Sequence, residues 1–85
     1  MSPVADERAA IGQTGIAATR ALIPGELGRV VFSVPVLGGE AWDYVADQPI
    51  HTGDRLRVIA VLTSEIEESG QRRERKILRV EKTGR

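Results

Sequence analysis

The residues that could support catalysis in this chain of 85 residues are few and scattered. His51 is the only histidine and there is no cysteine, so a metal site built on these ligands has no second member. Ser33, Ser64 and Ser69 do not lie in a nucleophile-elbow sequence, and a serine hydrolase is not expected. The composition therefore predicts that His51 is a turn or surface residue.

Three aspartates could provide carboxylates for acid-base chemistry. Asp54 follows Gly53 at an expected turn, and Asp47 precedes the bend at Pro49. Aspartate at such places accepts hydrogen bonds from nearby backbone amides, so a structural role is expected for these side chains and for Asp43. The chain is accordingly expected to be neither an enzyme nor a binder of metals or cofactors.

The distribution of charge is more informative than the net charge, which is zero. From residue 72 onward there are seven basic residues and two acidic ones, a net charge of +5, whereas the preceding residues carry −5. This basic segment includes Arg72, Arg73 and Arg75. It could form a cationic groove for single-stranded nucleic acid, contact anionic lipid headgroups, or be a solvated or protein-contacting face.

Trp42 and Tyr44 are expected on the same face of one strand. Such residues are enriched in protein interfaces, so this pair could anchor a partner. It could equally cover one side of the core. The candidate interaction surface consists of Trp42, Tyr44, Arg72, Arg73 and Arg75.

Short β-branched runs separated by glycine and proline predict five strands. The expected strands are residues 12–19, 29–36, 40–46, 55–62 and 73–81. A Pro-Gly turn at Pro24 and Gly25 should reverse the chain after the first of them.

Two hairpin turns are expected, at Gly38-Gly39 and at Ser69-Gly70. The first would pair Phe32 with Val45, Ser33 with Tyr44, Val34 with Asp43 and Pro35 with Trp42. The second would pair Ile59 with Val80, Val61 with Leu78 and Glu67 with Arg72.

Two strands should be irregular. Pro35 cannot donate to a ladder, so its strand is at an edge or bulged there. The alternation of apolar residues changes face between Val58 and Ile59, which predicts a β-bulge or a bend.

These elements predict one all-β domain, a small five-stranded OB-like barrel at residues 11–82. Residues 1–10 form a lead-in that could include a short helix, and residues 83–85 form a tail. No apolar run approaches the roughly 20 residues that a membrane-spanning helix needs, and no signal peptide is visible.

Several segments, taken in order, resemble the C-terminal soluble domain of NfeD-like proteins. They are Gly12-Gln13-Thr14-Gly15-Ile16-Ala17-Ala18-Thr19, Leu22-Ile23-Pro24-Gly25, Gly39-Glu40-Ala41-Trp42-Asp43, Pro49-Ile50, Gly53-Asp54-Arg55-Leu56-Arg57-Val58 and Ile77-Leu78-Arg79-Val80-Glu81. The resemblance implies an OB-type barrel attached behind transmembrane helices. It also implies work with stomatin- or flotillin-like membrane proteins that influences membrane proteolysis or membrane organisation.

The leading hypothesis is therefore a non-enzymatic protein-interaction module of a membrane-anchored NfeD-like protein. Its expected partner is a stomatin-, prohibitin- or flotillin-like membrane protein or a membrane protease. The expected location is the membrane, on its cytoplasmic side. The alternative hypothesis is an OB domain that binds single-stranded nucleic acid.

Overall fold

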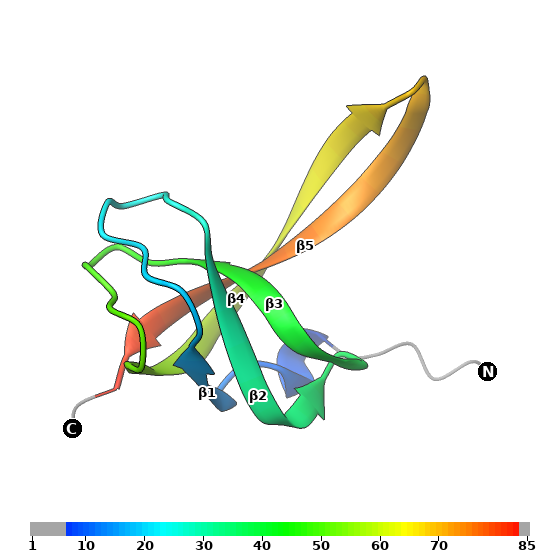
Figure 1. Ribbon diagram of the computed structural model, residues 1–85. Coiled ribbons are helices and arrows are strands. Elements are labelled where there is room, and N and C mark those ends of the chain that lie inside the picture. The colour runs from blue at the N-terminus through cyan, green and yellow to red at the C-terminus, as the bar shows by residue number, and fades with distance from the viewer. Residues whose placement is uncertain (1–6, 84–85) are drawn as a thin grey trace.

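Strands dominate the computed structural model, which describes residues 7–83 (Figure 1). The short helix expected within residues 1–10 is a 3-10 turn, η1, which is followed by the buried Ala10; residues 1–6 lie outside the described residues. The elements in chain order are η1 (Glu7–Ala9), β1 (Thr14–Ala17), β2 (Gly28–Val36), β3 (Gly39–Val45), β4 (Arg55–Glu68) and β5 (Gln71–Lys82).

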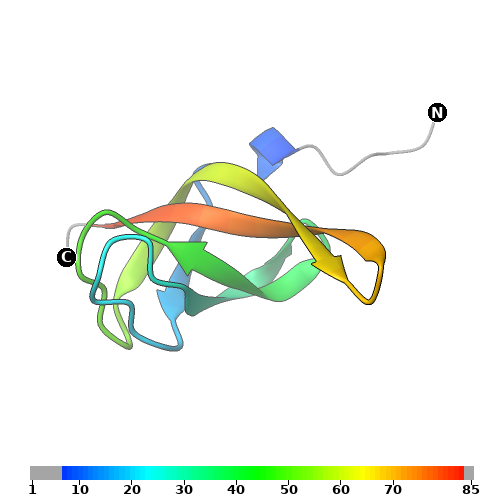
Figure 2. The same cartoon turned by 90° about the horizontal axis from the view of Figure 1, so that it is seen from above.

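The five strands close into a barrel in the order β1-β2-β3-β5-β4, with β4 pairing back to β1. All neighbouring strands are antiparallel except β3 and β5, which are parallel. Figure 2 shows the barrel from above. The predicted fold class, an all-β five-stranded OB-like barrel, is confirmed. Because the barrel is closed, the strands that would lie at the edges of an open sheet are paired with each other, which protects this valine-rich chain from edge-to-edge aggregation.

Strand β4 bends into the barrel at Ile59. Before it, Val58 pairs with Val80, and after it Ala60 pairs with Arg79, so Ile59 is an additional residue without a partner on β5. The bulge turns Ile59 outward, where it is 39% exposed, whereas Val58 is buried. The predicted change of face is confirmed. The predicted pairing of Ile59 with Val80 is wrong because the bulge gives that place to Val58.

The two hairpins differ in how well they follow the predicted register. At the second, Ser69 and Gly70 both have positive φ, 53° and 77°, as a tight hairpin turn requires. The predicted pairings of Val61 with Leu78 and Glu67 with Arg72 are confirmed.

At the first hairpin the turn is Leu37-Gly38, with φ of 51° and 83°, one residue earlier than predicted. Val36 pairs with Gly39 and Val31 with Ala41, so β2 advances by five residues while β3 advances by two. This irregularity contains Pro35, which cannot donate to the ladder. The pairings predicted for Phe32, Ser33, Val34 and Pro35 are therefore wrong.

The loop between β1 and β2, residues 18–27, contains the predicted Pro-Gly turn. Gly25 has a φ of +86°, and the Glu26 amide donates to the Ile23 carbonyl over 2.9 Å, as in a type II turn. The Glu26 carboxylate accepts from the amides of Leu22 and Ile23 at 2.9 and 3.2 Å. This loop is tied to the loop at residues 46–54 by a bridge between Ala21 and Ile50.

The core fills the barrel with aliphatic side chains and two aromatic ones. Among the described residues no polar or charged residue other than tyrosine is buried. The core residues are Ala10, Ala17, Ala21, Val30, Phe32, Val36, Tyr44, Ala46, Ile50, Leu56, Val58, Leu78 and Val80, with Leu37, Trp42 and Val61 packed against them.

Candidate interaction surface

Beyond the barrel, β4 and β5 continue together as a two-stranded arm, which we define as residues 62–77 (Figure 1). The arm begins where Leu62 pairs with Ile77 and ends at the Ser69-Gly70 turn. Strand β1 pairs with β4 only at residues 55–57, and β3 pairs with β5 only at Leu78 and Arg79. Among the described strands, none pairs with either outer edge of the arm.

Carboxylates balance the arginines predicted for the interaction surface. Arg72 lies 3.8 Å from Glu65 on the neighbouring strand, and both side chains are exposed. Arg75 reaches the Asp43 carboxylate of β3 at 3.4 Å, and Arg29 binds the same carboxylate at 3.0 Å. Arg75 thus links the arm to the barrel wall. The exposed pair between Arg72 and Glu65 is worth only about 0–1 kcal/mol.

Arg73 is exposed on β5, between Arg72 and Arg75 along the chain. The structure therefore brings these three arginines together on one element, as their sequence spacing suggested. They occupy both faces of the arm, because neighbouring residues of a strand point in opposite directions.

Tyr44 does not belong to the interaction surface, and its predicted place there is wrong. Its side chain has no exposed area, and its hydroxyl donates to the Thr19 carbonyl over 2.8 Å. Burial, with a smaller contribution from Asp54, raises the pKa of the Tyr44 hydroxyl, which favours the protonated donor. Tyr44 joins β3 to the loop between β1 and β2 from inside the barrel.

Trp42 is half-buried against the core. Its indole N–H donates to the carbonyls of Val36 and Gly39, over 2.9 and 3.2 Å, and so fastens the β2–β3 hairpin. The residue as a whole is partly exposed. Phe32 is buried, so Trp42 is the one residue among the phenylalanine, tryptophan and tyrosine of the chain that is not fully buried.

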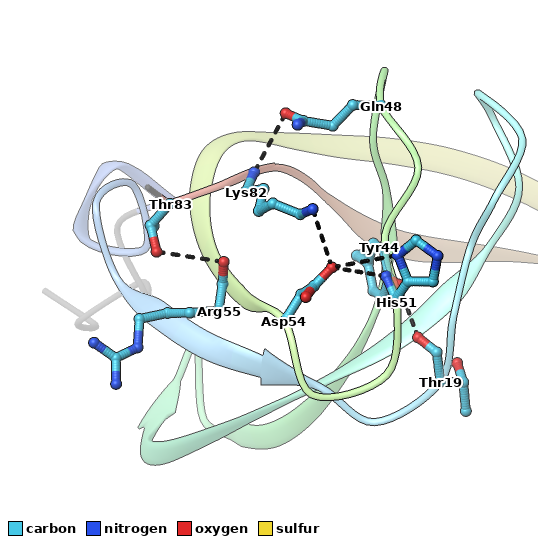
Figure 3. A network of polar contacts seen from close by, with 8 residues as sticks. All are labelled: Thr19, Tyr44, Gln48, His51, Asp54, Arg55, Lys82 and Thr83. Carbon is cyan, nitrogen blue, oxygen red and sulfur yellow. Dashed lines mark hydrogen bonds and ion pairs between the residues drawn. The ribbon is translucent and has the colours of Figure 1, made fainter. Parts of the chain in front are cut away.

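A polar cluster surrounds Asp54 at the start of β4 (Figure 3). The Asp54 carboxylate accepts from the His51 amide over 2.8 Å, as predicted for an aspartate at a turn. It lies 3.5 Å from the Lys82 ammonium and 3.9 Å from the His51 imidazole. The His51 side chain is 66% exposed, so the prediction of a surface histidine is confirmed.

The three aspartates do not form a paired acid-base site. Asp43 binds arginines of β2 and β5, Asp47 binds Arg79, and Asp54 caps its own turn. Within residues 7–83, no group of three histidine, cysteine, aspartate or glutamate side chains could hold a metal ion. The three carboxylates stabilise turns and strand contacts instead.

The Asp54 contacts predict a pH dependence of stability. The His51 amide, aided by Lys82 and opposed in part by burial, holds the pKa of Asp54 below its ordinary value of 3.8. Because the folded-state pKa is lowered, the stabilisation is complete above pH 3.8 and is lost as the pH falls through the folded-state value. We expect Asp54→Asn to lower the urea midpoint at pH 7. At a pH below the folded-state pKa of Asp54, where the parent carboxyl is protonated, the same substitution should leave the midpoint nearly unchanged.

His51→Ala is the matched control, because it keeps the backbone amide that is the main cause of the shift. The urea midpoint of His51→Ala should change by the same amount as that of the parent chain when the pH falls from 7 to below the folded-state pKa of Asp54. If His51→Ala removed the pH dependence instead, the imidazole would be its main cause.

The turn before Asp54 predicts that substitutions at Gly53 and at His51 differ in their effect on stability. Gly53 has a φ of +95°, and an added Cβ would meet no atom within 4 Å. Gly53→Val therefore forces a β-branched residue into the left-handed region, and we expect it to cost about 1–3 kcal/mol of unfolding free energy. His51→Ala alters an exposed side chain and should stay within about 0.5 kcal/mol. Urea unfolding at pH 7 compares them, and a larger loss for His51→Ala would contradict this.

None of the helices in the described part of the chain is long and apolar enough to span a membrane. Comparisons with protein-family models, with curated proteins and with solved structures gave no match for this chain.

Proposed function

We propose that this domain is a non-enzymatic protein-interaction module of a membrane-anchored NfeD-like protein. The arm contacts the partner, which is a stomatin-, prohibitin- or flotillin-like membrane protein or a membrane protease. The domain acts beside the membrane, on the cytoplasmic side, and influences membrane proteolysis or membrane organisation. The class of partner and the membrane anchor rest on the sequence resemblance, and the choice of surface rests on the arm.

The observation that carries this proposal is that the arm adds nothing to the core. Every buried side chain of the described residues lies outside residues 62–77. An isolated two-stranded hairpin is marginally stable in water, and the ion pair between Arg72 and Glu65, which joins the two strands of this one, is exposed. The arm is thus a regular element with exposed arginines and with outer edges that no described strand pairs with. Such an element suits the recognition of another protein.

The packing of the aromatic side chains favours a protein partner over single-stranded nucleic acid. Proteins that bind single strands stack bases on exposed aromatic rings beside a cationic groove. Phe32 and Tyr44 are buried, and Trp42 is half-buried with its N–H already bonded. Arg72 and Arg75 already face carboxylates. A negative strand would have to displace these carboxylates.

An arm-deleted variant tests the proposal. Replacing residues 63–76 by Asn-Gly joins Leu62 to Ile77, which already pair, through a turn that suits a tight hairpin. The thermal unfolding transition should be retained, because no core residue is removed. In the full-length, membrane-embedded protein, the deletion should abolish co-purification with a co-expressed stomatin-like protein.

The matched control is a charge-reversed variant, Arg72→Glu with Arg73→Glu, which keeps every residue of the arm. It separates the effect of the arm's charges from the effect of shortening the chain. It should weaken the same association while leaving the arm in place. Undiminished association in both variants would contradict the proposal. A gel shift of a single-stranded oligonucleotide at physiological salt, lost in the charge-reversed variant, would favour the nucleic-acid alternative.

A further inference from the structure

The arginines of the barrel and those of the arm differ in the residue that follows them along the chain. Five arginines of the barrel are each followed directly by a core residue whose exposed fraction is at most 2%. These pairs are Arg20-Ala21, Arg29-Val30, Arg55-Leu56, Arg57-Val58 and Arg79-Val80. In the arm, Arg72, Arg73 and Arg75 are followed by residues that are exposed or half-buried. The peptide bonds after the arm arginines are therefore the ones that lie away from the core.

The fold explains this difference. Successive side chains of a strand point to opposite faces, so in the barrel wall an outward arginine is followed by an inward core residue. The arm extends beyond the core, as Figure 1 shows. Residues 71–75 of β5 are all exposed, so neither face of the arm is covered there.

Arg20 is the strongest competitor within the barrel, because it is exposed and lies in a loop, where proteolytic cleavage is common. Its neighbours hold the backbone on both sides. The Ala21 amide donates to the Ile50 carbonyl over 3.0 Å, and the Thr19 carbonyl accepts from the buried Tyr44 hydroxyl over 2.8 Å. Separating this segment from the barrel would break contacts of the core.

The arm can open without such a loss. Every buried side chain of the described residues lies outside residues 62–77, so separating the two strands there uncovers no core residue. The pair between Arg72 and Glu65 spans 3.8 Å, with side chains 78% and 63% exposed. Opening of the arm should therefore cost less free energy than unfolding of the barrel. Cleavage of a segment that opens and closes rapidly depends on how often it is open.

We propose that the arm is a cleavage segment for endoproteases that cut after arginine or lysine. Such a protease accepts a basic side chain in an acidic primary pocket, and the run Arg72-Arg73-Glu74-Arg75-Lys76 offers four in five residues. The first cut falls after Arg72 or Arg73, because Arg75 is tied to Asp43 at 3.4 Å. Water is added across the peptide bond, which leaves a carboxylate on one residue and an amine on the next.

The barrel stays folded after this cut. The remaining part of β5 contributes the buried Leu78 and Val80, and it pairs with β4 as far as Lys82 and with β3 at Leu78 and Arg79. The two pieces, residues 1–72 and 73–85 for a cut after Arg72, should therefore remain associated. The cut dismantles the arm. Loss of the partner on cleavage rests on the function proposed above, whereas the cleavage itself does not.

Limited digestion of the folded chain with trypsin tests the proposal, with the fragments identified by mass spectrometry in denaturant. Cuts after Arg8 and Lys82 trim only the ends of the chain and are left out of the comparison. Among the other basic residues, the first cuts should fall after Arg72 or Arg73. The cut protein should elute as one species in native size-exclusion chromatography and keep the circular dichroism of the parent chain.

A variant that lacks the cleavage sites provides the second measurement. It replaces all four basic residues of the run by glutamine: Arg72→Gln, Arg73→Gln, Arg75→Gln and Lys76→Gln. The half-life of the uncut chain should rise at least about tenfold, because cutting then requires the barrel to unfold. The matched control is Arg20→Gln, which removes the exposed arginine of the loop and should leave the half-life of the parent chain unchanged.

Three results would overturn the proposal. They are first cuts after one of the five barrel arginines, loss of the β-sheet signal as the first cuts appear, and a half-life of the four-glutamine variant equal to that of the parent chain. The fragment map uses the parent chain, so it does not depend on the folding of a variant. It also needs no partner, so the cleavage segment and the proposed function can fail separately.

Discussion

Tyr44→Ala is expected to lower the unfolding free energy by about 3–5 kcal/mol, the usual cost of removing a fully buried aromatic ring. A domain of 85 residues has roughly 4–13 kcal/mol in total, at about 0.05–0.15 kcal/mol per residue. The substitution would therefore remove much of the stability. Urea unfolding followed by circular dichroism measures the loss.

Tyr44→Phe separates the ring from the hydroxyl. It keeps the buried ring and deletes the donor to the Thr19 carbonyl, so about 1–3 kcal/mol should be lost. Ile23→Ala is the control, because Ile23 is 68% exposed and its truncation should change the unfolding free energy by less than about 0.5 kcal/mol. A loss for Tyr44→Ala no larger than that for Ile23→Ala would place Tyr44 outside the core.

Trp42 allows a sharper comparison between packing and partner binding. Because its ring is half-buried, Trp42→Ala should cost less stability than Tyr44→Ala. If Trp42→Ala also abolished association of the full-length protein with its partner while the melting temperature stayed unchanged, the accessible part of the ring would belong to the interface. A large fall in melting temperature would instead assign Trp42 to the core.

The hairpins show how much of the fold could be predicted from sequence. Ser69-Gly70 fits a two-residue turn, and an uninterrupted ladder carries that register back to Leu78. Gly38-Gly39 suits a tight turn equally well, yet Leu37 accepts a positive φ and moves the turn by one residue. The irregularity around Pro35 then displaces the register further. Local turn preferences could not predict the β2–β3 register, because it also depends on packing across the barrel.

The candidate surface was predictable only in part, for the same reason. Arg72, Arg73 and Arg75 are close in sequence, so their placement on one element followed from a single hairpin. Trp42 and Tyr44 do share the inward face of β3, but a strand pattern alone could not say which face the barrel would bury.

Gly28→Ala is expected to cost about 3 kcal/mol, toward the upper end for overpacking a core. Gly28 lies directly opposite Tyr44 in the β2–β3 register. A Cβ at this position would come within 2.4 Å of the Tyr44 ring. The ring has little room to move, because it is buried and its hydroxyl is bonded to Thr19. Urea unfolding of the single variant measures the cost.

Gly39→Ala provides the matched strand glycine, since its Cβ would lie 3.2 Å from the half-buried Trp42 ring and should cost less than about 1 kcal/mol. The decisive measurement is a double-mutant cycle with Tyr44→Leu, which removes the atoms that the new Cβ would strike. In that background Gly28→Ala should also cost less than about 1 kcal/mol, a strongly non-additive result. Additive losses would show that Gly28 is required for its backbone conformation rather than for the space that it leaves to Tyr44.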